Sequence, residues 1–135
     1  MSKLLSKDDI LKREDIVAKT VEVPEWGGEV MIRTMTGQER DAFEDYVVTF
    51  EQDRKKKGGA RLNLRAELLS RCIVDGDGNL LFTEPADIVA LGGKSGKALD
   101  RCFKVAQELS RFTDKDLDEL EGNSGTVPED DTTSI

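Results

Sequence analysis

The chain has 135 residues, which suits a single domain, and its 20 basic against 28 acidic side chains give a formal net charge of −8. It contains no histidine, so the commonest general base and the Ser-His-Asp and Cys-His arrangements are missing, and we expect no enzyme. No apolar run is long enough to span a membrane, and the first residues lack the apolar stretch of a signal peptide. These features predict a soluble intracellular protein that does not bind membranes.

Charge and polarity divide the sequence into three parts. Residues 1–14 form an N-terminal helical or flexible segment, residues 15–121 a single globular domain, and residues 122–135 a disordered acidic tail. From Thr113 onward eight acids stand against one base, Lys115, which accounts for −7 of the total charge. An acidic end of this kind repels phosphate backbones, so we expect no nucleic-acid partner.

The first predicted structure of the domain is an antiparallel hairpin over about residues 16–35. Two runs rich in β-branched residues alternate apolar and polar side chains on either side of Gly27-Gly28. Pro24 lacks a backbone N–H and is expected at the end of a strand. A two-stranded hairpin is marginal alone and must pack on helices.

Helical patterns fill the rest of the domain. Thr36-Gly-Gln-Glu39 is a capping-box pattern, and the basic run Arg54–Lys57 followed by glycines is typical of a helix end. Pro85 indicates the start of the third predicted helix. The predicted helices cover about residues 37–53, 60–74, 84–91, 95–111 and 114–121. The expected fold class is therefore α+β, mainly α, with a small antiparallel β-hairpin packed on a bundle of about four to five helices.

Two short motifs resemble ligand-binding loops but do not complete them. Asp75-Gly-Asp-Gly-Asn79 matches the start of a calcium loop, yet Ala86 stands where the bidentate glutamate belongs. Residues 92–98 resemble a phosphate loop, but neither possible frame supplies all its required residues. We interpret them as a tight turn and as a helix break followed by a Ser N-cap, and we predict no cofactor and no metal. Cys72 and Cys102 fall on apolar helix positions and are expected to be reduced core residues.

Trp26 is the only tryptophan and lies at the glycine-rich bend of the hairpin. Such a residue either folds back into a small core or contacts a partner, since tryptophan is favoured at binding hot spots. The stripe Phe43, Tyr46 and Phe50 has helical spacing and is core by default.

Several segments resemble the tail assembly chaperones of phages and prophages with long, non-contractile tails. The resemblance rests on Val21-Glu-Val-Pro-Glu-Trp-Gly-Gly-Glu-Val-Met-Ile-Arg33, on Met35-Thr-Gly-Gln-Glu-Arg-Asp-Ala-Phe43, on the Asp75–Phe82 turn and on Asp87-Ile-Val-Ala-Leu91. It covers about residues 8–112. The order and spacing of these pieces carry it, since each is short.

The resemblance implies a non-catalytic protein that binds the phage tape-measure protein, keeps it soluble and assists assembly of the tail tube. It also implies possible contact with the tail tube protein, action in the host cell cytoplasm, absence from the mature virion and, in many members, a longer frameshifted form. We expect a homo-oligomer. As a hypothesis, Trp26 anchors the partner, Val23 and Pro24 line the contact, and Phe43 and Tyr46 support it from the following helix.

Two other functions stay open at this point. A small structural component of a phage particle, such as a head–tail connector protein, would need β-arms or ring surfaces that the sequence does not indicate. An acidic inhibitor of a nucleic-acid enzyme rests on the acidic tail alone.

Overall fold

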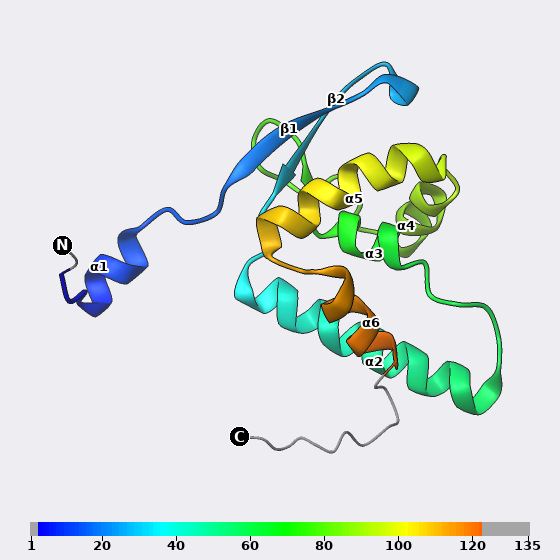
Figure 1. Cartoon of the computed structure of the whole chain (residues 1–135). Coiled ribbons are helices and arrows are strands. Elements are labelled where there is room, and N and C mark those ends of the chain that lie inside the picture. The colour runs from blue at the N-terminus through cyan, green and yellow to red at the C-terminus, as the bar shows by residue number, and fades with distance from the viewer. Residues whose placement is uncertain (1–2, 123–135) are drawn as a thin grey trace.

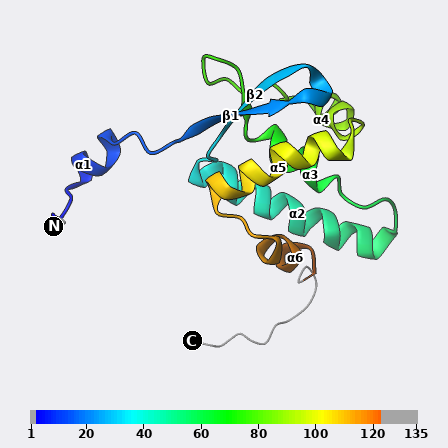
Figure 2. The ribbon, with the colours of Figure 1, turned by 45° about the horizontal axis from the view of Figure 1, so that its top comes forward.

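A computed structural model describes residues 3–122 and confirms a mainly α, α+β fold (Figure 1). The elements are α1 (Lys7–Lys12), β1 (Ala18–Val23), the 3₁₀ turn η1 (Pro24–Trp26), β2 (Gly28–Arg33), α2 (Gly37–Lys57), α3 (Leu64–Ser70), β3 (Ile73–Val74), α4 (Pro85–Gly92), α5 (Gly96–Ser110) and α6 (Asp114–Gly122). Helix α5 packs on β1 and β2, α3 packs on both α4 and α5, and α2 packs on α6. The sheet and α2 therefore lie on opposite sides of α5 and α3 (Figures 1 and 2).

The predicted hairpin is present, and a third strand extends it. Strands β1 and β2 pair antiparallel from Ala18 opposite Arg33 to Val23 opposite Gly28. The two-residue strand β3 then pairs with β2, so the sheet order is β1-β2-β3 and β1 is an edge strand. This corrects the helix predicted over residues 60–74. Helix α3 ends at Ser70, and Ile73 joins the sheet because pairing with β2 satisfies its backbone better than another helical turn.

Helix α2 begins as predicted and runs longer. The Thr36 hydroxyl accepts the N–H of Glu39 at 3.1 Å, and the Glu39 carboxylate accepts the N–H of Thr36 at 2.8 Å. The helix continues to Lys57, beyond the expected end near residue 53, and Gly58 follows with φ of +78°. The basic run therefore forms the last helical turn, where positive charge is favourable beside the helix C-terminus.

One core lies between the sheet and the helices. The largest fully buried side chains include Phe43, Phe112, Ile32, Leu68 and Leu69. Phe43 and Phe112 meet edge to face with their ring centroids 5.6 Å apart, which fixes α2 against the chain after α5. Cys72 and Cys102 are free and buried, as predicted.

The helices at the two ends of the described chain differ, because α6 packs on the domain and α1 does not. Helix α6 packs on α2 and buries Leu117. Helix α1 buries no residue, and both views show it standing away from the body at the start of β1 (Figures 1 and 2). The predicted acidic tail lies outside the described residues from position 123 onward.

Candidate partner-binding site

The turn at the end of the hairpin is fixed by its backbone and by one ion pair. Gly27 follows η1 with φ of +76°, a conformation that favours glycine, and its N–H bonds the carbonyl of Pro24 at 3.1 Å. Glu25 pairs with Arg101 of α5, with Nε–Oε1 at 2.9 Å and Nη2–Oε2 at 3.2 Å. Trp26 is therefore held at a defined place above the end of α5.

Beside this turn lies an apolar groove of about 190 Å³, which we call the hairpin groove. Its lining consists of Trp26, Phe82, Ala90, Leu91 and Lys94. Trp26 and Phe82 are half-buried and pack partly against the core, while Ala90 is exposed on α4. The groove can therefore accept one or two apolar side chains, with Trp26 as a wall that the core supports.

One basic side chain lines the hairpin groove, and two more follow on the next helix. Lys94 lines it, and Lys97 and Arg101 follow on the first turns of α5. The hydrogen bond from Arg101 is the main cause that lowers the pKa of Glu25, with a smaller contribution from the charge of Lys97. Glu25 thus stays ionised and paired with Arg101, and Lys94 is the charged side chain in the lining of the groove. The arrangement suits an apolar segment that carries acidic side chains.

The structure does not bring the five predicted partner-binding residues together. Val23 and Phe43 are 0% exposed, so they support the fold and present no surface in this conformation. Pro24 and Trp26 lie at the turn beside the hairpin groove. Tyr46 is 39% exposed on α2, which both views place on the far side of α5 from that turn.

Tyr46 belongs to a separate aromatic cluster. Its ring lies 6.2 Å from that of Phe50, and the Arg71 guanidinium stands 5.6 Å from its centroid. Burial, followed by the nearby charge of Glu67, raises the pKa of Tyr46. These contacts anchor α2 to the end of α3 and give Tyr46 a structural role.

Four residues of the hairpin groove were missed from the sequence, namely Phe82, Ala90, Leu91 and Lys94. A signal was present, because the first three lie in segments that carry the family resemblance. Trp26, Phe82 and Leu91 come from three such segments, and they meet at this one place in the structure. Phe82 lies 56 residues after Trp26, and Leu91 lies 9 residues after Phe82. Their convergence could therefore be seen only in the folded structure.

The two loops resembling ligand motifs have other structural roles. The Asp75 carboxylate accepts the N–H groups of Asp77 and Asn79 at 2.8 and 3.0 Å, which makes a tight turn. The Ser95 hydroxyl accepts the N–H of Ala98 at 3.3 Å and caps α5. Within residues 3–122 no group of three acidic or cysteine side chains is arranged to hold a metal ion. Burial raises the pKa of Cys72 to about 12 and that of Cys102 to about 11, so neither is an activated thiol.

A family model described as phage tail assembly chaperone matches residues 10–127, most of the chain. The chain belongs to this family. No curated protein and no solved structure shows a significant match to it. Membership in the phage tail assembly chaperone family supports a role in tail assembly, implies binding to a phage tail protein and suggests a non-catalytic protein. Among the described helices, none is both long and apolar enough to cross a membrane.

Proposed function

We propose that this tail assembly chaperone binds the tape-measure protein and keeps it soluble, using the hairpin groove as the contact. The observation that carries the proposal is the convergence of Trp26, Phe82 and Leu91 on one apolar groove. A tape-measure protein is a long, largely helical chain whose apolar faces need cover before the tube encloses it. A groove for one or two apolar side chains fits a protein that covers such a chain in many copies and then leaves.

The remaining parts of the proposal follow from this role. The protein acts in the host cell cytoplasm, assists tube assembly with possible contact to the tail tube protein, and is absent from the mature virion. Its function is binding, without a catalytic step. The charge of Lys94 in the groove lining favours acidic residues beside the bound apolar positions.

The test uses two equivalent substitutions on α4. Ala90→Glu places a charge in the hairpin groove, and Ala86→Glu, one turn away on the same helix, is the matched control because Ala86 is exposed and does not line the groove. Each variant is co-expressed with the tape-measure protein from the same phage. We expect Ala90→Glu to lose co-purification and to leave the tape-measure protein insoluble, while Ala86→Glu behaves as the unchanged chain.

Thermal unfolding of both variants separates binding from folding, because neither alanine is in the core. Selective loss of binding by an Ala90→Glu protein that remains folded at the assay temperature supports the proposal, and a small difference in melting temperature is expected because the glutamates stand at opposite ends of α4. Full binding by Ala90→Glu would rule out the hairpin groove as the contact. A tape-measure protein that stays soluble without this chain would overturn the chaperone role itself.

A further inference from the structure

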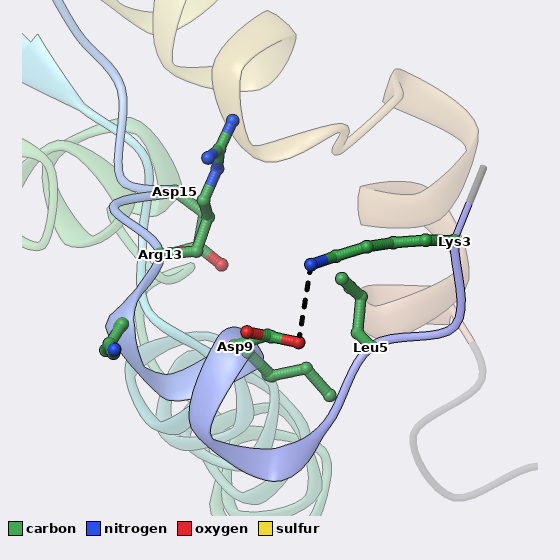
Figure 3. A pocket seen from close by; sticks show the side chains of 7 residues that line it. Lys3, Leu5, Asp9, Arg13 and Asp15 are labelled. Carbon is green, nitrogen blue, oxygen red and sulfur yellow. Dashed lines mark ion pairs between the residues drawn. The ribbon is translucent and has the colours of Figure 1, made fainter. Parts of the chain in front are cut away.

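The N-terminal arm, residues 3–17, has an apolar surface that the rest of the described chain, residues 18–122, leaves uncovered. Leu4 is 99% exposed, Ile10 57% and Leu11 76%, and α1 buries no residue. Seven residues of the arm line an open hollow of about 690 Å³, with Leu5 and Asp9 among them. Lys3 is paired to Asp9 at 3.8 Å beside it (Figure 3). A helix of six residues is marginal in water, so this surface has reason to pack on something.

Within residues 3–122, the strand that follows the arm has one unpaired edge, because β1 is the outer strand of the sheet. The carbonyl of Val17 accepts the N–H of Thr34 at 2.9 Å, so the residues bonded to β2 are Val17 and every second residue after it. Ala18, Thr20 and Glu22 therefore direct their N–H and C=O groups to the open side of β1. An open edge of this kind can pair with a further strand.

We propose that two copies of this chain pair through their β1 strands, antiparallel about a two-fold axis, and that each arm lies on the other copy's hairpin turn. A strand pairs with itself in this way without any further complementarity, because a two-fold axis perpendicular to the sheet makes the strands antiparallel. This axis maps each face of the sheet onto the same face of the partner's sheet. Residues that stand opposite each other across the pair must therefore both be even-numbered or both be odd-numbered. A register centred on Thr20 satisfies this condition, because it places Thr20 opposite Thr20 and Ala18 opposite Glu22.

Antiparallel pairing also determines where the arm goes. The residues before β1 of one copy continue past the end of β1 in its partner, toward the partner's Pro24–Trp26 turn. With Thr20 opposite Thr20, Ile16 comes opposite Pro24 and Glu14 opposite Trp26. The apolar surface at that end is the hairpin groove, next to Val89, which is 73% exposed on α4. The chain's own groove is out of reach, since the hairpin turn beside it and the arm lie at opposite ends of β1 (Figure 1).

Charge does not oppose this contact, although the whole chain carries −8. Residues 3–15 hold four bases (Lys3, Lys7, Lys12, Arg13) and four acids (Asp8, Asp9, Glu14, Asp15), so the arm is neutral. One interface thus covers two apolar surfaces and one open strand edge in each copy. Arm and tape-measure segment would then compete for the same groove, a consequence that rests on the proposed function.

A cross-linking experiment on the full chain tests the pairing directly. In Thr20→Cys the two introduced thiols lie close, because Cα atoms of a hydrogen-bonded antiparallel pair are about 5.5 Å apart. Glu29→Cys is the matched control, because Glu29 is exposed on the same hairpin but lies on β2. In the dimer the two β1 strands would stand between the two β2 strands. The two Glu29→Cys thiols would therefore be farther apart than the Thr20→Cys thiols by two strand spacings of about 4.8 Å each. The native Cys72 and Cys102 are buried in both variants.

We expect a short bismaleimide to give a covalent dimer with Thr20→Cys at micromolar concentration and none with Glu29→Cys or the unchanged chain. Equal yields for both variants, or no dimer from Thr20→Cys, would overturn the pairing. The assay contains no tape-measure protein, so its failure leaves the proposed function standing, and loss of client binding leaves the cross-link unaffected.

Sedimentation then tests the arm. Leu11→Lys should raise the dimer dissociation constant about tenfold or more, as expected for an aliphatic side chain that becomes buried on association. Its melting temperature at high dilution should not change, because Leu11 contributes nothing to the monomer core. An unaltered dimer in Leu11→Lys, or an unchanged chain that is monomeric at all concentrations, would contradict the proposal.

Discussion

Glu39 connects three parts of the fold through one carboxylate. It accepts two hydrogen bonds from the Arg33 guanidinium, both at 2.7 Å, and also the N–H of Thr36. The side chains are 14% and 26% exposed, so the pair is shielded from water. The link between Glu39 and Thr36 was predicted from the capping-box pattern. The pairing with Arg33 was not, since it depends on how β2 meets α2.

Replacing Glu39 by glutamine should destabilise the protein by about 1–2 kcal/mol, because charge-assisted hydrogen bonds at a shielded site are lost. The matched control is Glu44→Gln, which removes an exposed ion pair with Arg40 at 3.4 Å and should cost no more than about 0.5 kcal/mol. Urea unfolding at pH 7 measures both. A loss in Glu44→Gln equal to that in Glu39→Gln would contradict the special role of Glu39.

The same comparison has a predicted dependence on pH. The hydrogen bond from Arg33 is the largest cause that lowers the pKa of Glu39 below its ordinary value of 4.5. A carboxyl group whose pKa is lowered by folding stabilises the protein above its unfolded pKa, and that stability is lost as the pH falls through the folded value. The difference between the unchanged chain and Glu39→Gln should therefore be constant near pH 7 and shrink below about pH 4.5.

At the scale of elements, the sequence correctly predicted the features that depend on neighbouring residues, namely helix caps, helix starts and the hairpin turn. The Thr36 and Ser95 caps, Pro85 at a helix start and the hairpin over Gly27-Gly28 are all present. The third strand was missed because a short apolar run has no periodicity that separates a buried strand from a helix. Residues 72–74 leave the helical path since β2 offers them a ladder, with Arg33 N–H donating to the Cys72 carbonyl at 2.9 Å.

Helix α5 ends at Ser110 and is capped by Arg111, the only non-glycine residue with positive φ among residues 3–122, at +57°. A side chain in this conformation costs about 1 kcal/mol, and glycine removes most of that cost. We expect Arg111→Gly to stabilise the protein by about 0.5–1 kcal/mol relative to Arg111→Ala, which removes the same charge but keeps a Cβ. Thermal unfolding of the two variants measures the difference. A glycine variant no more stable than the alanine variant would show that the backbone is not strained here.

At the scale of the whole molecule, the candidate site could be predicted only in part. Trp26 was identified because it is a large side chain at a glycine-rich bend and lies within a segment that carries the family resemblance. Val23 was grouped with it as a sequence neighbour and Phe43 as a support from the following helix, but the fold turns both into the core. The other wall of the groove comes from Phe82 and α4, and no periodicity in the sequence indicates that α4 packs beside the hairpin turn.

The charge of the molecule is separated along its length. The segment from Thr113 onward carries −7, while residues 1–112 carry −1. Part of the acidic segment is α6, which packs on α2 and buries Leu117, and the rest follows Gly122. Folding and charge can therefore be tested separately by two truncations.

Truncation after Gly122 should leave the melting temperature within a few degrees of that of the full chain, since only two of the removed side chains, Val127 and Ile135, are apolar. It removes Glu129, Asp130 and Asp131, which takes the formal charge from −8 to −5. Truncation after Thr113 is the comparison: it also removes Leu117, which is 3% exposed, and should cost about 2 kcal/mol or more. Calorimetry of the two proteins measures both effects. A large drop after the first truncation would show that the acidic tail packs on the body, because its loss of charge alone reduces self-repulsion and cannot destabilise the fold.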